Sequence, residues 1–286
     1  MKKTLLCALF LVLPGCVLAA TSLWEVRSAG SIAYLGGTCH VLRPSDYPLP
    51  AEFGRAYNAV QAVVFEADPG QMASSEVQQM IMSGAVYQDG RTLFEVLSPA
   101  TYANLKNYCQ RRGIPLEHLE RFKPAILAVT LLTFELQKLG VDAGGVDQYF
   151  HGKAVADGKS IDALETARQQ VEFILDMGQG NEDAFMASCL EDMERLNEVF
   201  DHLITAWRAG DEATLEALTA TEVREKFPAV YKMLFTDRNR AWLPAIEAYM
   251  RTPQPELILV GAGHLVGEDG LLAMLRQRGY QVRKVQ

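Results

Sequence analysis

The chain has 286 residues, of which 49% are apolar and 22% are charged, and its formal net charge is −8. This length and apolar fraction are sufficient for one large core, and no Pro-rich or Ser-rich linker divides the chain into two domains. The acidic balance and the absence of a Lys or Arg cluster exclude nucleic acid from the expected partners.

The N-terminus has the pattern of a secretory signal. Met1-Lys2-Lys3 precedes an uncharged apolar run from Thr4 to Leu13, which is too short to remain as a membrane span. We expect a signal peptide over residues 1–19 and a mature domain over residues 20–286 that is periplasmic or secreted, with no transmembrane span. Loss of Lys2 and Lys3 changes the formal net charge from −8 to −10.

A second interpretation of the leader is open. Leu13-Pro14-Gly15-Cys16 resembles the cleavage box of a lipoprotein, in which case the chain begins at Cys16 and is anchored by a lipid. Of the remaining cysteines, Cys109 and Cys189 both lie in helical patterns. They either form a disulfide in an oxidising compartment or pack as small apolar residues.

The first predicted elements form a parallel strand–helix–strand unit. Trp24 to Arg27 and Ser31 to Leu35 are strands on either side of a short turn, which predicts a hairpin. A helix follows from Leu49-Pro50 to Ala59, and Ala62 to Phe65 is a compact buried strand. A helix between two strands indicates that they run parallel.

The middle of the chain is predicted to be helical. The pattern is helical throughout from Met72 to about Asp157, which we interpret as a helical insertion over about 72–157. Ser160 to Leu164 is a further short strand, and Thr166 caps the helix after it. More helices are expected over residues 181–220.

The last segment predicts another strand–helix–strand unit. Asp237 is expected to cap a helix that begins at Arg238. Glu256 to Val260 is a strand, Gly267 to Arg278 a helix, and Gln281 to Val285 a final edge strand. The predicted fold is therefore a single α/β domain, with a central, mostly parallel β-sheet flanked by helices and a large helical insertion.

One short motif occurs twice. Gly37-Thr38-Cys39-His40 and Gly261-Ala262-Gly263-His264 each follow an apolar, strand-like run. A glycine at the end of a strand lets the backbone bend and lets another group approach closely. The histidine three residues later can then point into the crevice beyond the carboxyl ends of the strands, where open α/β sheets collect ligands and catalytic groups.

Four polar residues are expected at this edge of the sheet: His40, Glu66, Glu165 and His264 each follow a predicted strand. Two imidazoles and a carboxylate, here His40, His264 and Glu66, suit a divalent metal such as Mn, Co or Zn and leave positions open for water and substrate. Such a metal would lower the pKa of its bound water, and a glutamate could serve as the general base.

Arg238 and Asn239 are the remaining candidates. They stand at the predicted start of a helix just before the last parallel strand, where backbone amides and a guanidinium could hold a carboxylate or an oxyanion. Cys39 stands beside the first motif histidine. If its segment stays extended, Cys39 points away from His40 into the core, and if it turns inward, Cys39 becomes a soft ligand.

The order of these motifs resembles that of the TraB/GumN family over nearly the whole mature chain. The matching phrases are Gly37-Thr38-Cys39-His40, Phe65-Glu66-Ala67-Asp68, Gly145-Val146-Asp147, Gly158-Lys159 to Leu164-Glu165-Thr166, Arg238-Asn239 and Gly261-Ala262-Gly263-His264-Leu265. The resemblance implies a fold related to the Tiki metalloproteases, the erythromycin esterases and a haem-binding lipoprotein group. It also implies that His40, Glu66, Arg238 and His264 share one crevice, supported by Gly37, Glu165, Asn239, Gly261 and Gly263.

Three functions follow from this resemblance. The first is an exported, metal-dependent hydrolase of a peptide or small molecule, in which His40 and His264 bind the metal, Glu66 binds it or activates water, and Arg238 stabilises the oxyanion. The second is a metal-independent esterase in which His40 is the general base. The third is a protein without catalysis that binds haem or another ligand, or that is an accessory factor for surface polysaccharide.

Overall fold

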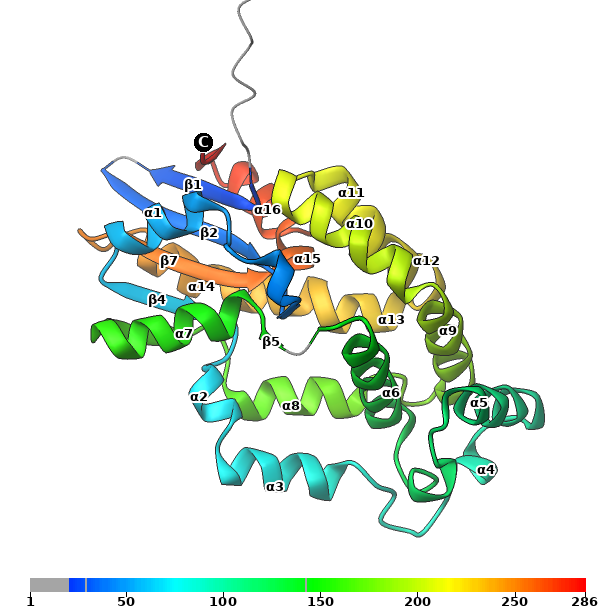
Figure 1. Ribbon diagram of the computed structural model, residues 1–286. Helices are drawn as coiled ribbons and strands as arrows, with labels where there is room; N and C mark the ends of the chain where they lie inside the picture. The colour runs from blue at the N-terminus through cyan, green and yellow to red at the C-terminus, as the bar shows by residue number, and fades with distance from the viewer. Residues whose placement is uncertain (1–20, 29, 142) are drawn as a thin grey trace, which may run out of the picture.

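The structure is a computed structural model that describes residues 21–286 except Ala29 and Asp142. The predicted signal peptide and Cys16 lie outside these residues. A six-stranded sheet in the order β6-β4-β7-β2-β1-β8 forms the centre of the fold (Figure 1). Its strands are β1 (Leu23–Ser28), β2 (Ser31–Thr38), β4 (Ala62–Phe65), β6 (Ser160–Ala163), β7 (Glu256–Gly261) and β8 (Gln281–Lys284).

The four strands β6, β4, β7 and β2 are parallel neighbours, whereas β1 runs antiparallel to both β2 and β8. Thr38, the last residue of β2, lies opposite Gly261, the last of β7, and Phe65 of β4 lies opposite Ala163 of β6. Phe65 also lies opposite Leu259, so β4 and β6 end two residues before β7. This arrangement confirms the predicted α/β fold and the predicted hairpin and edge strand. It also brings the residues that follow these four strands to one edge of the sheet.

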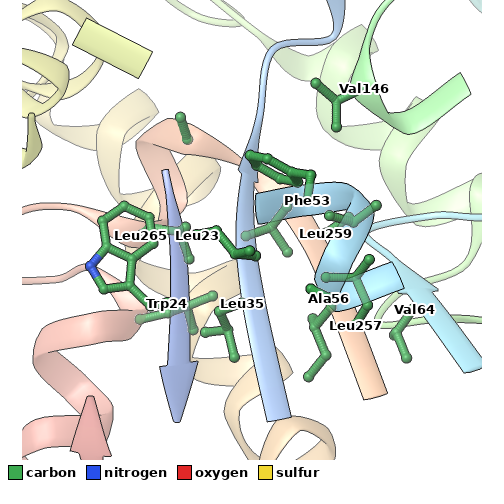
Figure 2. Close-up of a cluster of buried hydrophobic side chains, with 14 of the residues drawn as sticks. Leu23, Trp24, Leu35, Phe53, Ala56, Val64, Val146, Leu257, Leu259 and Leu265 are labelled. Atoms are coloured by element: carbon green, nitrogen blue, oxygen red, sulfur yellow. The ribbon is translucent and has the colours of Figure 1, made fainter. Parts of the chain in front are cut away.

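The central strands are hydrophobic because both faces of the sheet are covered. Every residue of β7 is buried, and Figure 2 shows Leu257 and Leu259 of β7 beside Phe53 and Ala56 of the helix α1, which spans Ala51–Ala59. The position of Gly36 in β2 is also part of this packing, because a Cβ there would lie 2.7 Å from Leu259 and 2.8 Å from Phe53. A larger residue at position 36 would therefore require the buried Leu259 and Phe53 side chains to shift.

Helices fill most of the rest of the chain. Between β2 and β6 they are α1 (Ala51–Ala59), α2 (Pro69–Met72), α3 (Ser75–Gly84), α4 (Leu93–Val96), α5 (Pro99–Arg112), α6 (Pro124–Lys138) and α7 (Val146–Asp157), with 3-10 turns at Pro44–Asp46 and Leu116–His118. Between β6 and β7 they are α8 (Ala167–Asp176), α9 (Glu182–Glu194), α10 (Leu196–Ala209), α11 (Glu212–Glu216), α12 (Glu222–Lys226), α13 (Pro228–Tyr231) and α14 (Arg238–Tyr249), with π-helical turns η3 (Ala217–Thr221) and η4 (Lys232–Asp237). The short α15 (Ala262–Leu265) and α16 (Leu271–Gln277) follow β7.

Some of these helices pack against the sheet, and others form a distant group beyond it. In Figure 1, α1 crosses the front of the sheet and α14 runs behind it, while α3, α4, α5 and α6 lie away from the sheet. A separate hydrophobic cluster joins α4, α5 and α6 to α9, with Leu105 of α5, Leu127 of α6 and Met186 of α9 among its buried members. Helix α3 packs instead against α8 in a small third cluster. The helices beyond the sheet thus include α9, which follows β6 in sequence. Helix α7 precedes β6 and packs against β4 and β6 of the sheet.

Two details of the predicted helices are wrong. The segment from Met72 to Asp157 is not helical throughout, because β5 (Ala143–Gly144) pairs with β3 (Val41–Leu42) in a small antiparallel sheet. The helix at Arg238 has no N-terminus at Asp237. Asp237 itself has helical dihedral angles and makes no side-chain cap, because the π-helical turn η4 runs directly into α14.

The three cysteines of the described residues, Cys39, Cys109 and Cys189, are free. The alternative of a Cys109–Cys189 disulfide is therefore not formed in this structure. Cys39 belongs to the main core and is 7% exposed, which is the extended, core-facing alternative. In the part of the chain that the structure describes, no helix is long and apolar enough to cross a membrane.

Candidate functional site

A cavity of about 440 Å³ lies at the carboxyl edge of the parallel strands. Its walls come from the loops after β2 and β4 and from the helices α2, α3, α7 and α8. The residues that line it are His40, Glu66, Ala67, Pro69, Met72, Ala73, Gln78, Asp147, Gln148 and Gln170. Two of the four predicted strand-end residues, His40 and Glu66, therefore reach the cavity directly.

His40 is held in place by Asp147, a residue that lies 107 positions later in the chain. His40 Nδ1 lies 2.9 Å from Asp147 Oδ2. Since a carboxylate only accepts, Nδ1 carries a proton, and Nε2 has the free lone pair whenever the ring is neutral. The His40 side chain is 61% exposed. Within the described residues Nε2 makes no hydrogen bond.

The backbone around Gly145 sets this pair. The Gly145 N–H donates to His40 O and the Val146 N–H donates to Cys39 O, each at 3.0 Å. A Cβ on residue 145 would lie 2.0 Å from Cys39 O, so only glycine permits this approach. Helix α7 begins at the next residue, which places Asp147 in its first turn beside His40.

The Arg238 guanidinium joins the ends of β4 and β6. Its Nη2 donates to Glu66 Oε2 at 2.8 Å and to Glu165 Oε1 at 2.6 Å, and its Nε donates to Glu165 Oε2 at 3.1 Å. The three side chains are 5–8% exposed. Arg238 is thus the buried counter-ion of two carboxylates, with the ring of Trp242 4.6 Å from its Cζ.

His264 lies beside this network in a fixed tautomer. Its Nδ1 is 2.8 Å from Asn239 Oδ1, and Asn239 Nδ2 donates to the carbonyls of His264 and Asp269. Because the Asn239 amide nitrogen is used by two carbonyls, its oxygen accepts from His264 Nδ1. His264 Nε2 then accepts from Arg238 Nη1 at 3.1 Å.

The pKa values follow from this geometry. Burial, together with the Arg238 cation, lowers the pKa of His264 to about 3, although Glu66 opposes the shift. Burial alone would raise the pKa of Glu66, but His264, His40 and Arg238 lower it to about 2. For His40, desolvation acts against protonation, but the Asp147 carboxylate outweighs it and raises the pKa above its usual value.

We expect His264 to make the protein less stable in acid. Its folded-state pKa is below the unfolded value of about 6.5, so the unfolded chain binds a proton that the folded chain does not. The free energy of unfolding should therefore fall as the pH drops from about 6.5 towards 3, by at most about 1.4 kcal/mol per pH unit for this group. Denaturant titrations at a series of pH values measure this slope.

The control for that measurement is His264→Gln, which removes the titrating ring. Its slope between pH 6.5 and 4.5 should be smaller than that of the parent by roughly one proton. The same replacement at the exposed His202 should leave the slope unchanged. A parent whose unfolding free energy is flat over this range would contradict a buried, neutral His264.

The motif glycines are needed where groups approach closely. A Cβ on Gly261 would lie 3.0 Å from His40 Nε2 and 3.3 Å from Glu66 Oε1, and the Gly261 N–H donates to that same oxygen at 2.7 Å. A Cβ on Gly37 would lie 3.2 Å from Ala262 Cα, and one on Gly263 would lie 2.9 Å from Thr219 Oγ1. Gly261 therefore keeps His40 and Glu66 close together, whereas Gly37 and Gly263 serve the packing.

The predicted metal ligands lie close together, but their donor atoms do not fit a divalent ion in this arrangement. His264 Nε2 and Glu66 Oε2 both accept from Arg238, and Glu66 Oε1 accepts from Gly261 N. The lone pairs that would hold a dication thus surround a guanidinium, whose charge repels a second cation. Among the described residues, no three His, Cys, Asp or Glu side chains form a group that could hold a metal ion.

The structure brings the predicted polar residues to one edge of the sheet, with Glu66, Glu165, Arg238 and His264 in one hydrogen-bonded network. Arg238 contacts Glu66, Glu165 and His264 directly, and His40 lies across Gly261 from Glu66. Asn239 has a different place from the one expected. It is 1% exposed and braces His264, and since the helix continues through Asp237, there is no free helix N-terminus to bind an anion.

Two residues of the site were not predicted. Asp147, which orients His40, stands in the Gly145-Val146-Asp147 phrase, and its signal was an acidic residue two positions after a pair of glycines. Gln170 of α8 lines the cavity, and its Nε2 donates to Glu66 Oε2 at 3.1 Å. Nothing in the local sequence distinguishes Gln170 from other helical glutamines.

We compared the chain with protein families, curated proteins and solved structures, and only the comparison with families gave a match. The family model described as the TraB/PrgY/gumN family matches residues 22–284. No curated protein and no solved structure matches the chain. Because the family match spans nearly all of the chain, the protein belongs to the TraB/PrgY/gumN family.

Proposed function

We propose that this member of the TraB/PrgY/gumN family is an exported hydrolase of carbonyl esters that works without a resident metal, with His40 as its general base. The observation that carries the proposal is the pairing of His40 with Asp147. It leaves one basic nitrogen, His40 Nε2, unbonded within the described residues at a cavity of about 440 Å³. An imidazole whose second nitrogen is held by a carboxylate is an arrangement well suited to general base catalysis.

The proposed reaction needs only water and the ester. His40 Nε2 removes a proton from a water molecule as the water oxygen forms a bond to the carbonyl carbon. The carbonyl π electrons move to oxygen and give a tetrahedral oxyanion. When the intermediate collapses, the bond to the alkoxide breaks, and the proton on His40 passes to the leaving oxygen, so that the acid and the alcohol are released and His40 is neutral again.

Gln170 is the donor that we assign to the oxyanion. Its amide has two N–H groups, one of which is used by Glu66 at 3.1 Å. The residue also lines the cavity, so its second N–H is available to a substrate oxygen. Arg238 is less suited to this role, because its Nε, Nη1 and Nη2 atoms already donate to Glu165, His264 and Glu66.

We expect the pH profile of turnover to depend on Asp147. A base acts when it is unprotonated, so kcat/KM should rise with pH up to the raised pKa of His40 and then level off. Asp147→Asn removes the charge that raises this pKa, so the midpoint should move towards about 6.5 and the plateau should fall. Stopped-time assays across pH 5–10 and NMR titration of the His40 ring measure both effects, and an unchanged midpoint would contradict the pairing.

The experiment that tests the proposal is hydrolysis of p-nitrophenyl butyrate by mature protein in excess chelator. We expect turnover that is unaffected by the chelator and lost in His40→Ala. Turnover that disappears with the chelator and returns with one divalent ion would replace this proposal with the metal-dependent hydrolase. No turnover of any ester would contradict catalysis of this kind.

The two alternatives that use a bound group are less well supported. Binding of a metal by Glu66 and His264 requires Arg238 to give up its hydrogen bonds to both residues. His264 is also poorly placed to bind haem iron, because both ring nitrogens are hydrogen-bonded and the residue is 6% exposed. A Soret band on addition of haem, abolished by His264→Ala, would reverse this assessment.

A further inference from the structure

The cavity has an uneven set of charges. Of the residues that line it, Glu66 and Asp147 are acidic and His40 is an imidazole. Among the described residues, no Lys or Arg lines this cavity. The remaining polar residues are the glutamines 78, 148 and 170. A ligand in this cavity therefore meets carboxylates and neutral amides.

The buried cation beneath the cavity does not balance these charges. Arg238 is 7% exposed and is shared by two carboxylates, Glu66 and Glu165. Glu66 alone is enough to neutralise it. Asp147 then has only His40 as its partner, and His40 must be uncharged to act as a base, so the Asp147 charge is uncompensated at the moment that the proposed reaction begins.

The charged groups on the surrounding walls do not reverse this sign. Asp68, at the start of α2, lies 3.3 Å from His151. Glu76 of α3 and Arg168 of α8 lie 3.8 Å apart, and both are exposed. Glu76 and Arg168 balance each other, and Asp68 is itself an acidic residue, so these groups bring no net positive charge to the cavity.

We infer that the natural substrate carries a positive charge, such as an ammonium group joined by a short chain to the carbonyl that is attacked. This inference rests on the proposed hydrolase function and specifies its substrate class. The cation would lie against the start of α7, near Asp147 and the exposed Gln148. The stem would lie along Pro69, Met72 and Ala73, which supply the apolar part of the wall.

Three matched esters test this inference. We would compare kcat/KM for the p-nitrophenyl esters of γ-trimethylammoniobutyric acid, its uncharged tert-butyl isostere and glutaric acid, each divided by its rate with hydroxide alone. We expect the order cationic, neutral, anionic, with at least about a tenfold difference between the first and the last at low salt. The difference should shrink when salt is added.

Variants of Gln148 locate the effect. Gln148→Lys should reduce the ratio of cationic to anionic turnover, and Gln148→Glu should increase it. Gln277→Lys adds the same charge at an exposed position that does not line this cavity, so the ratio should remain that of the parent. Equal turnover of the three esters, or preference for the glutarate ester, would overturn the inference while leaving the hydrolase proposal standing, whereas no turnover of any ester would refute both.

Discussion

Replacement of Arg238 by Ala lowers the free energy of unfolding by about 3–5 kcal/mol, the usual cost of removing one partner from a buried ion pair. Two carboxylates, Glu66 and Glu165, are 5–6% exposed and depend on this guanidinium. Without it they remain buried and unpaired, and His264 Nε2 loses its donor as well. Denaturant unfolding at pH 7 measures the loss.

A matched control lies two residues along the same helix. Arg240 is 66% exposed and is 4.0 Å from Asp269, so Arg240→Ala should change the unfolding free energy by no more than about 0.5 kcal/mol. If Arg238→Ala does not fold, Arg238→Lys can be measured instead. It keeps the charge but cannot hydrogen-bond Glu66 and Glu165 in the same planar arrangement, so its effect on the unfolding free energy should be intermediate. Equal stabilities for the Arg238 and Arg240 variants would contradict a buried, Arg-centred network.

The second large effect is on turnover. His40→Ala should lower kcat for ester hydrolysis by about 10²–10⁴, the usual contribution of a general base. The stability of the protein should change little, because the His40 side chain is 61% exposed and its ring contacts Asp147 at the surface of the cavity. A large loss of rate with an unchanged unfolding midpoint separates catalysis from folding.

His202 provides the control for this variant, since it is exposed on α10 and does not line the cavity. His202→Ala should keep the parental rate. Recovery of part of the rate when imidazole is added to His40→Ala would support a proton-transfer role. A His40→Ala variant with parental turnover would show that another group is the base.

The sheet and the strand-end residues could be predicted because they depend on local patterns. Ala62 to Phe65 is a short apolar run, and Glu256 to Val260 is an apolar strand before a glycine turn, and both are central strands in the structure. Parallel strands bring their carboxyl ends to one edge. That rule is sufficient to gather His40, Glu66, Glu165 and His264.

The partners of these residues depend on packing that no local pattern specifies. Asp147 reaches His40 only because Gly145 lies against the backbone of Cys39 and His40, 107 residues away along the chain. The two carboxylate partners of Arg238 could not be predicted for a related reason. Its helix looked like one that starts at Asp237, but the turn η4 continues into α14 and buries the guanidinium between two carboxylates.

The chemistry of the site therefore depends on which cation neutralises Glu66, and this distinguishes the two hydrolase mechanisms. A divalent metal and the Arg238 guanidinium would compete for the same lone pairs of Glu66 and His264. In the structure these lone pairs accept from Arg238. Arg238 makes no hydrogen bond to His40 among the described residues, and His40 is the base in the mechanism that we propose.

The most direct test of this account is the metal content of mature protein, measured by elemental mass spectrometry after purification without chelator or affinity metal and after incubation with Mn, Co and Zn. The parent should be measured beside the His40→Ala/His264→Ala double variant. We predict that both hold far less than one metal ion per chain and do not differ. Near-stoichiometric metal in the parent, lost in the double variant, would contradict the account and establish a metal site at His40, Glu66 and His264.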